Sequence, residues 1–371
     1  MHFAPIIHWK YKHILKPVFF RMDPEYIHDR MVGIGAWLGS HAGTRTITSW
    51  FFEYKNPMLE QDILGIHFLN PVGLAAGFDK NARIAGYMAD VGFGFAEIGS
   101  ITAQPSKGNS GKRLWRLPKS RGLVVNYGLS NEGAKAVCER LRKSAFRIPV
   151  GVSMAKTNCA ECAIDEVGIE DHIGSFKTCL DVGDYYTINV SCPNAFGGQP
   201  FHRPETLDRL LSALDQIPTS KPIFLKLSPD APTADLDDVV AVANRHRVHG
   251  FILTNLTKRY ELPSIDQDEL ATQNITTGGI SGKPVEELSN LLIKHLYQTT
   301  RGKYVIIGCG GIFTAEDAYK KIKCGASLVQ LITGMIYEGP QLIGEINHGL
   351  VKLLEKDGYK NISEAVGKNR A

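Results

Sequence analysis

The feature that most constrains the fold is an alternation that begins at Asn70 and continues almost to the end of the chain. Short apolar runs alternate there with segments of helical periodicity. The runs predict eight buried strands, at residues 72–76, 95–98, 150–154, 186–190, 223–227, 250–254, 305–307 and 328–331. Five of the segments between them predict helices, at residues 205–216, 234–245, 284–297, 314–324 and 339–354.

Strands that alternate with helices in this way predict an α/β fold with a parallel (β/α)8 barrel, the TIM barrel. A doubly wound sheet is the alternative, although no G-x-G-x-x-G motif follows the first strand. Residues 100–149 and 256–283 interrupt the alternation and are expected to be long loops, which in barrels commonly carry function.

Composition excludes several classes of protein. The chain has 371 residues, of which 43% are hydrophobic and 22% charged, as is typical of a globular protein with a large core. A net charge of +4 is only mildly basic and argues against a dedicated nucleic-acid-binding protein. The cysteines are scattered and odd in number, so we expect no disulfide framework and predict a reducing compartment. Cys159 and Cys162 form a C-x-x-C pair without a second pair of ligands, so they are expected to be ordinary loop cysteines rather than a metal site.

Residues 1–60 differ from the rest and are predicted to form an N-terminal extension to a barrel of residues 61–371. The first residues combine aromatic and aliphatic side chains with basic ones, and no acid precedes Asp23. The sequence Asp23-Pro24-Glu25 predicts a helix start, because it combines a capping residue, a proline and an acid in the first turn.

We therefore predict two short helices whose apolar and basic surface suits an anionic membrane; a helical cap docked on the barrel is the alternative. The chain has no apolar run of about 18 residues, so no membrane-spanning helix is predicted. Lys10, Lys12 and Lys16 interrupt the early apolar stretch, so no signal peptide is predicted either.

The candidate active site is the segment Asn189-Val190-Ser191-Cys192-Pro193-Asn194, where a predicted strand opens into a loop. Pro193 ends the strand because it has no N–H to donate. Cys192 is the strong nucleophile or base of this segment, and the asparagines offer paired donors and acceptors for a flat heterocycle. Because catalytic groups of barrels lie at the carboxyl ends of the strands, we expect chemistry here.

Small residues follow the last two predicted strands, at 308–311 and 332–334, and Gly278-Gly279-Ile280-Ser281-Gly282 adds a further glycine loop. Such loops let backbone N–H groups close on phosphate oxygens, so a phosphorylated ligand is predicted; tight turns alone are the alternative. Lys80 and Lys226 lie at predicted strand ends, where they suit a Schiff base, an anionic ligand or a structural salt bridge.

Together these motifs resemble the dihydroorotate dehydrogenases, which are FMN-dependent (β/α)8 barrels of pyrimidine synthesis. The resemblance extends from about Phe20 to about Ile346. Its landmarks are Met22-Asp23-Pro24-Glu25 with His28, the segments 70–80, 97–100 and 189–194, Thr254-Asn255, and the segments 278–282 and 307–312.

The N-terminal extension resembles that of the quinone-dependent class, in which two helices form an apolar mouth for the quinone. The resemblance implies a peripheral enzyme on the cytoplasmic face of a membrane, with dihydroorotate, orotate and a quinone as partners and no nucleic acid. It implies oxidation of dihydroorotate, with Cys192 as the base that removes the C5 proton and no metal.

The resemblance also implies ligand contacts. FMN is expected to contact Ala76, Gly77, Lys80, Ser100, Ser153, Asn189, Lys226, Thr254, Gly282, Gly311, Ile332 and Thr333. Dihydroorotate is expected to contact Lys80, Asn126, Asn131, Asn189, Asn194 and Asn255. Gly311 and Thr333 would hold the phosphate, and Lys226 would stabilise the negative charge of the reduced flavin.

The chain departs from the quinone-dependent class at several positions. That class usually has serine where Cys192 stands, whereas the soluble class has cysteine. The substrate loop, normally Asn-Arg-x-Gly-Phe-Asn, is altered, so that Val125 and Asn126 fall on its first two positions while Asn131 is expected to keep its role. Leu256, Ile332 and Ser153 replace residues that are commonly threonine, tyrosine and asparagine.

The alternatives are a dihydroorotate dehydrogenase with a soluble acceptor such as fumarate, a flavin-free Schiff-base aldolase that uses Lys226, and a phosphate-binding or membrane-docking module.

Overall fold

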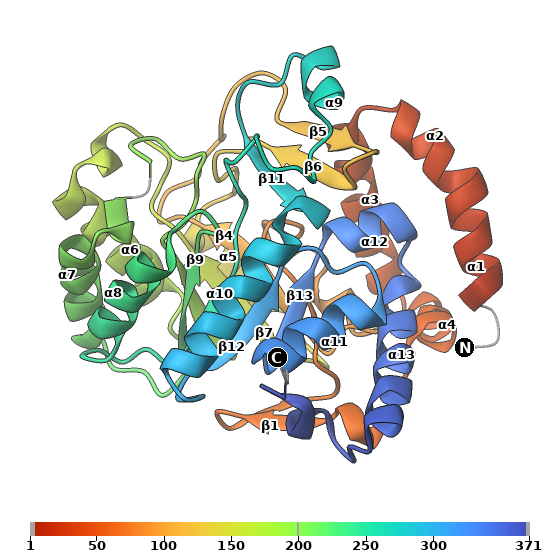
Figure 1. Ribbon diagram of the computed structural model, residues 1–371. Coiled ribbons are helices and arrows are strands. Elements are labelled where there is room, and N and C mark those ends of the chain that lie inside the picture. Colours follow the sequence, from red (N-terminus) through yellow and green to blue (C-terminus); the bar gives the residue numbers. More distant parts are fainter. Residues whose placement is uncertain (1–3, 199, 369–371) are drawn as a thin grey trace.

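The computed structural model describes residues 4–198 and 200–368. Its centre is a closed barrel of eight parallel strands whose order around the barrel follows the chain (Figure 1). The strands are β3 (Val72–Leu74), β4 (Phe95–Ile101), β7 (Val150–Met154), β8 (Tyr185–Asn189), β9 (Ile223–Leu227), β10 (Gly250–Leu253), β12 (Val305–Cys309) and β13 (Leu328–Leu331). The predicted barrel is confirmed, and each predicted strand is present with its ends shifted by at most three residues.

Helices surround the barrel and cover its apolar outer face (Figure 1). They are α5 (Ala134–Arg142), α6 (Asp165–Thr178), α7 (Pro204–Asp215), α8 (Thr233–Ala243), α10 (Glu286–Thr299), α11 (Ala315–Cys324), α12 (Thr333–Glu338) and α13 (Leu342–Asp357). All five predicted helices are present. Helix α11 begins with a capping box between Thr314 and Asp317, and Gly325 (φ +130°) ends it.

The two segments expected to be long loops contain a second sheet, which corrects that expectation. Strands β5 (Leu114–Leu117), β6 (Gly122–Val125) and β11 (Gly279–Gly282) pair antiparallel in the order β11-β6-β5. With helix α9 (Gln267–Thr272) they lie over one end of the barrel (Figure 1). Trp115, Val124, Leu270 and Ile280 form their own apolar core, so this layer is a packed roof rather than a flexible loop.

A short hairpin of β1 (Gln61–Ile63) and β2 (Ile66–Phe68) precedes the barrel. Its last residue, Phe68, packs edge-on against Phe95, with 5.4 Å between ring centroids, in a buried cluster with Tyr185 and Phe224. This cluster fills one end of the barrel, and the other end is left for ligands.

The N-terminal extension consists of helices on one side of the barrel (Figure 1). Helix α1 (Ala4–Lys10), a π-helical turn (Tyr11–Leu15) and α2 (Lys16–Arg21) follow one another directly, and α3 (Pro24–Gly39) and α4 (Ala42–Phe52) complete it. The predicted helix start is confirmed, because the Asp23 carboxylate accepts a hydrogen bond of 2.9 Å from the Tyr26 N–H.

Helix α4 was not predicted, and the barrel holds it in place. The Asp90 carboxylate, only 1% exposed, accepts hydrogen bonds from Arg45 Nε (2.8 Å) and Ser49 Oγ (2.8 Å), both on α4. Arg147 also pairs with Asp90. None of the helices in the described part of the chain is long and apolar enough to span a membrane.

A disulfide joins Cys138 on α5 to Cys179, the residue after α6, with 5.8 Å between their Cα atoms. This single disulfide was not predicted from the sequence, which led us to expect no disulfide framework. The two residues are 41 positions apart in the sequence, and only the packing of neighbouring helices on the barrel brings them together.

Candidate active site

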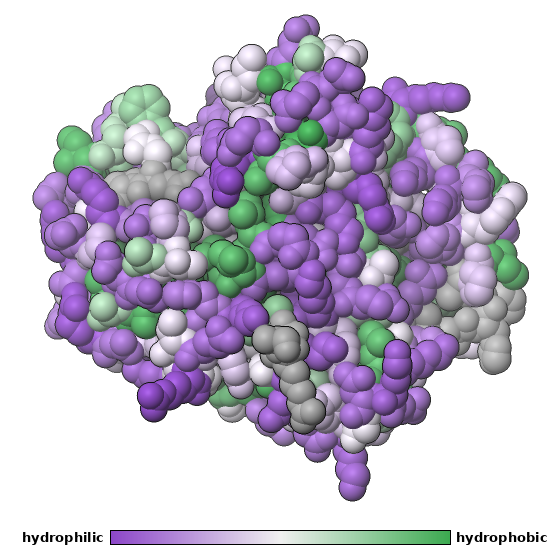
Figure 2. Space-filling model, in the orientation of Figure 1, coloured by the Kyte–Doolittle hydropathy of each residue, from purple (hydrophilic) through white to green (hydrophobic). Residues whose placement is uncertain are grey.

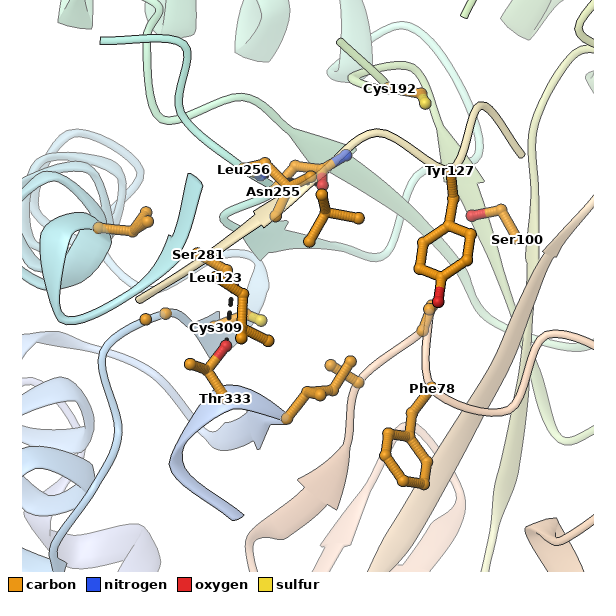
Figure 3. Close-up of a pocket in the computed structure, with 18 of the residues that line it drawn as sticks. Phe78, Ser100, Leu123, Tyr127, Cys192, Asn255, Leu256, Ser281, Cys309 and Thr333 are labelled. Atoms are coloured by element: carbon orange, nitrogen blue, oxygen red, sulfur yellow. Dashed lines mark hydrogen bonds between the residues drawn. The ribbon is translucent and has the colours of Figure 1, made fainter. Parts of the chain in front are cut away.

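A cavity of about 1300 Å³, part of it open to solvent, lies between the carboxyl ends of the barrel strands and the β5–β6–β11 sheet (Figure 3). Most of the residues singled out from the sequence line it. They are Ala76, Gly77, Lys80, Ser100, Asn189, Cys192, Asn194, Lys226, Thr254, Asn255, Gly282, Gly311, Ile332 and Thr333. Ser153, Asn126 and Asn131 do not line it.

One end of the cavity is a cradle of backbone. Gly310 and Gly311 follow β12 with φ of +119° and +77°, and Gly282 ends β11 with φ of +91°. A Cβ atom on Gly311 would come within 2.3 Å of Glu286, so only glycine fits there. Ser281 Oγ and Thr333 Oγ lie 2.9 Å apart beside this cradle (dashed line in Figure 3). Exposed backbone with adjacent hydroxyls suits phosphate oxygens.

A chain of hydrogen bonds connects the polar wall of the cavity. Asn189 Nδ2 donates to Ser100 Oγ at 2.8 Å, and Ser100 Oγ is 2.8 Å from Ser153 Oγ. Ser153 therefore acts on the cavity through Ser100, although it does not line it. Asn255 Nδ2 lies 2.9 Å from the Ser191 carbonyl oxygen and 3.3 Å from Asn189 Oδ1, so both asparagines are held rigidly.

Lys226 reaches the cavity from β9 and is 4% exposed. Its Nζ lies 3.9 Å from Glu97 Oε1 in the barrel core. The other oxygen of Glu97 accepts hydrogen bonds from Thr187 (3.0 Å), Gln330 (3.1 Å) and Tyr185 (3.3 Å). Lys226 is thus both a salt-bridge partner and a cation that faces the cavity, as sequence analysis allowed.

Lys80 joins the barrel to the N-terminal extension. Its Nζ lies 3.1 Å from His28 Nε2 on α3 and 3.9 Å from the centroid of the Tyr127 ring. Burial lowers the pKa of His28 to about 3, so the neutral imidazole accepts the hydrogen bond from Lys80. Burial also lowers the pKa of Lys80 to about 8, against the charges of Asp29 and Glu25. Lys80 is therefore a cation at neutral pH that can lose its charge in mildly alkaline solution.

Cys192 lies on the loop after β8, at the cavity wall (Figure 3). Burial raises the pKa of its thiol, while backbone hydrogen bonds and the positive charges of Lys156 and Lys258 lower it. The pKa of the thiol is raised on balance, and the charges of the two lysines oppose that rise.

Two buried polar atoms at the cavity, on Asn194 and Tyr127, have no partner among residues 4–198 and 200–368. Asn194 Nδ2 donates to the Val125 carbonyl oxygen at 2.7 Å, but its Oδ1 is unpaired. The Tyr127 hydroxyl is buried and also unpaired, and burial raises its pKa. Buried polar atoms are rarely left without partners, so both atoms suit a polar ligand in the cavity. The position of Tyr127 at the cavity was not predicted from the sequence.

The substrate loop differs from the expectation. The Asn131 side chain makes hydrogen bonds with Thr102, Leu129 and Gly133, so it supports the backbone. Asn126 Oδ1 accepts a 3.0 Å hydrogen bond from Asn109. Without a gap, the six-residue motif that begins at Val125 and Asn126 ends at Ser130. Ser130 lines the cavity, and this alignment could have predicted it.

No cluster of side chains that could hold a metal ion occurs within residues 4–198 and 200–368.

A sequence profile of the family described as "Dihydroorotate dehydrogenase" matches residues 58–354, which is most of the chain. The chain belongs to the dihydroorotate dehydrogenase family. Among curated relatives of this family, "Dihydroorotate dehydrogenase (quinone)" of a Nostoc species is 38% identical over 96% of this chain and 98% of its own length. The protein of the same name from Gloeobacter violaceus is 38% identical over 95% of this chain and 98% of its own.

Solved structures agree with this membership. Ligand-free DHODH from Eimeria tenella superposes with a TM-score of 0.83 at 30% identity, covering 94% of this chain and all of the other. DHODH from the same organism in complex with ferulenol gives a TM-score of 0.80 at 29% identity, covering 94% of this chain and 96% of the other.

Dihydroorotate dehydrogenases are flavoproteins, and the residues present fit a flavin. The glycine cradle with Ser281 and Thr333 provides room and donors for a phosphate group. Lys226 provides a buried cation at the cavity wall. The unpaired Asn194 Oδ1 and Tyr127 hydroxyl leave polar atoms for a second, smaller ligand.

Proposed function

We propose that this protein oxidises (S)-dihydroorotate to orotate with FMN as its flavin and passes the electrons to a membrane quinone, as a step of de novo pyrimidine synthesis. The observation that carries the proposal is one cavity that combines a phosphate cradle, two lysines and a thiol with an apolar arm, which is the part of the cavity lined by Phe78, Leu114, Leu123 and Ile336. Relatives that match nearly the whole chain bear the name of the quinone-dependent enzyme.

FMN would be held by the residues that the sequence singled out. Its phosphate would lie against Gly311, Gly282 and Thr333, and its ring would face Lys226 and the Ser100–Asn189 pair. When bound, FMN supplies an acceptor for the hydride from C6 of the substrate. The positive charge of Lys226 opposes the negative charge that the ring gains on reduction, which favours reduction.

Dihydroorotate would bind between Lys80 and the asparagines. Its carboxylate requires a cation, which Lys80 supplies, and its ring amides require the donors and acceptors of Asn194 and Asn255. The unpaired Asn194 Oδ1 can accept a hydrogen bond from a ring N–H. Cys192 would remove the C5 proton, because it is the basic group at the cavity wall once its thiol is ionised.

A quinone would enter through the apolar arm of the cavity. Leu114, Leu123, Phe78 and Ile336 line this arm, and His28 of α3 lies among them (Leu123 and Phe78 are labelled in Figure 3). An apolar passage that reaches the flavin site from the side of the N-terminal helices suits a lipid-soluble acceptor better than fumarate, which is a small dianion.

The extension would place this entrance on the cytoplasmic face of a membrane, as a peripheral contact. Large apolar side chains are more than 50% exposed along it, among them Ile6, Trp9, Ile14, Val18 and Trp37. Figure 2 shows apolar side chains between hydrophilic ones at the edge formed by α1 and α2. An amphipathic surface with aromatic and basic residues is typical of helices that lie in the membrane interface.

The test is anaerobic rapid mixing of the purified yellow protein, followed at the flavin absorption band. Dihydroorotate is added first, and then either a short-chain quinone or fumarate. We expect bleaching by dihydroorotate and return of the colour with the quinone alone. Return of the colour with fumarate would assign the soluble acceptor instead, and a colourless protein would favour the aldolase or a non-enzymatic module.

A further inference from the structure

A lysine outside the predicted site lies buried behind Cys192. Lys156 follows β7 and is 4% exposed. Its Nζ donates a 2.6 Å hydrogen bond to the carbonyl oxygen of Phe196, which belongs to the same loop as Cys192. Burying an ammonium group costs free energy, and an uncharged donor could make the same hydrogen bond to Phe196. The positive charge of Lys156 therefore indicates a role beyond holding this loop.

Lys156 and Cys192 face one small cavity on the barrel side of the loop. This cavity is also lined by His172, Asn189 and Phe201, and its volume is about 240 Å³. His172 is 1% exposed, and neither of its ring nitrogens has a partner in the part of the chain that the structure describes. Burial lowers the pKa of His172 to about 3, with a further contribution from Lys156, so the imidazole is neutral. Lys156 is thus the side chain that brings charge to this cavity.

The other titratable groups near Lys156 offset its charge only in part, because none of them among the described residues forms a salt bridge with it. Asp171 is the acid that acts on Lys156, but hydrogen bonds from the Thr157 N–H (2.7 Å) and hydroxyl (2.6 Å) orient its carboxylate toward Thr157. Cys159 and Cys162 also act on Lys156, and burial raises the pKa of Cys162 to about 12, so that this thiol is neutral.

A second lysine, Lys258 on the loop after β10, also acts on Cys192. Lys258 is exposed, so solvent and salt screen its charge. The carboxylate of Asp230, close by, accepts a hydrogen bond from the Lys258 backbone N–H at 2.7 Å. Of the two lysines, the buried one acts in the less screened environment.

We propose that Lys156 is a positioning residue for proton abstraction: its ammonium holds the Cys192 loop through Phe196 and stabilises the Cys192 thiolate. The inference rests on the proposed function and deepens it. The C5–H bond of the substrate breaks and an S–H bond forms at Cys192, which later returns the proton to solvent. The electron pair of the C–H bond stays with the substrate and forms the C5–C6 double bond as hydride leaves C6 for the flavin.

The experiment compares wild type with Lys156→Met and Lys156→Arg by the rate of flavin reduction with dihydroorotate across the neutral and alkaline pH range. Without the charge, we expect reduction to be about tenfold slower at neutral pH and to recover in alkaline solution, because one pKa unit is a tenfold change in the thiolate fraction. Lys156→Arg should remain close to wild type, because it keeps the charge.

A second measurement does not depend on turnover. The rate of alkylation of Cys192 by iodoacetamide, followed on its own peptide by mass spectrometry, reports its thiolate fraction. In the flavin-bound protein, Lys156→Met should move this profile to higher pH by about one unit. Lys258→Met serves as the matched control and should shift it less, since that lysine is exposed. If Lys156→Met does not retain flavin, Lys156→Gln takes its place in both measurements.

Two results would overturn the inference while leaving the proposed function intact. In one, dihydroorotate bleaches the wild type, but the pH profiles of reduction and alkylation are the same for Lys156→Met as for the wild type. In the other, Lys258→Met shifts the profiles as much as Lys156→Met does. Failure of the wild type itself to bleach would instead reject the proposed function.

Discussion

Cys192 and Lys80 are both titratable side chains that burial pushes toward their neutral forms, yet the proposed reaction needs both of them charged. Each is supported by a neighbour: cationic lysines act on the thiol, and acids on α3 act on Lys80. Burial makes the charge of each side chain depend on pH and on its charged neighbours, and replacing one residue at a time measures this dependence.

Replacing Cys192 separates binding from chemistry. Cys192→Ala removes the base, so flavin should remain bound while reduction by dihydroorotate falls by at least about a hundredfold, the usual contribution of a general base. Cys192→Ser should reduce the flavin slowly. Serine still offers an oxygen that can accept the proton, but it is a far weaker base than a thiolate. Flavin content and rapid-mixing rates report both effects, and an alanine variant at full speed would reject Cys192 as the base.

Lys80 gives substrate affinity a pH dependence of known sign. Its pKa of about 8 means that the free enzyme loses this positive charge as the pH rises through 8, far below the usual range of lysine. The affinity for orotate, measured by its perturbation of the flavin spectrum, should therefore fall as the solution becomes alkaline. Lys80→Arg should remove this dependence, because arginine stays charged. The same decline in Lys80→Arg would assign the titration to another group.

Of the residues at the cavity, those that belong to a sequence motif could be predicted, whereas those that reach the cavity only through tertiary packing could not. Lys226 lies near the carboxyl end of one predicted strand and Gly311 follows another, so their position at the cavity could be inferred from spacing alone. Lys156 follows a predicted strand too, but its contact with the Cys192 loop depends on how that loop folds back across β7 and β8. The position of Tyr127 at the cavity depends on the β5–β6–β11 sheet, which was not predicted.

Among the elements, the barrel strands were predictable because they are buried on both faces and appear as continuous apolar runs. Strands β5 and β6 were not, because they are short and because glycine and proline punctuate the long segment that contains them. Helix α4 was missed because it lacks an acid in its first turn and a side-chain cap, so its position depends on Asp90 of the barrel.

Helices α1 and α2 form an element whose removal should affect one half of the reaction. The π-helical turn between them contacts the barrel domain through a 2.7 Å hydrogen bond from the Tyr11 hydroxyl to the Ile336 carbonyl oxygen, and α2 does so through the Phe20 ring against Tyr337. Ile336 lines the apolar arm, whereas His28, on α3, stays with Lys80 when α1 and α2 are absent.

Deleting residues 1–21 should therefore lower the rate of flavin reoxidation by quinone by about tenfold, which corresponds to ~1.4 kcal/mol of barrier. Flavin reduction by dihydroorotate should remain within about a factor of two, a change of only ~0.4 kcal/mol. Rapid mixing measures the two half-reactions separately on the same sample. Equal losses in both would mean that α1 and α2 stabilise the whole cavity, and no loss in either would reject the quinone entrance.

The whole molecule is asymmetric in its surface. Of the fifteen well-exposed large apolar side chains among the described residues, eleven belong to the first fifty residues. The same segment carries Lys10, Lys12, Lys16 and Arg21, with no acid before Asp23. The apolar arm of the active-site cavity lies beneath these helices, so one side of the molecule combines the entrance with a surface suited to anionic lipid.

Membrane binding should accordingly have an electrostatic and an apolar part that can be separated. We expect sedimentation with vesicles that contain anionic lipid, and weaker binding when salt rises from about 0.1 M to about 1 M, because the Debye length falls from ~10 Å to ~3 Å. Replacing both Trp9 and Val18 with serine should weaken the binding that persists at high salt, because these side chains are 57% and 52% exposed. Leu291→Ser is the matched control, since Leu291 is 58% exposed on α10, outside the extension. If the control weakens binding as much as the double replacement does, or if no vesicle binds the wild type, the extension is a cap on the barrel rather than a membrane contact.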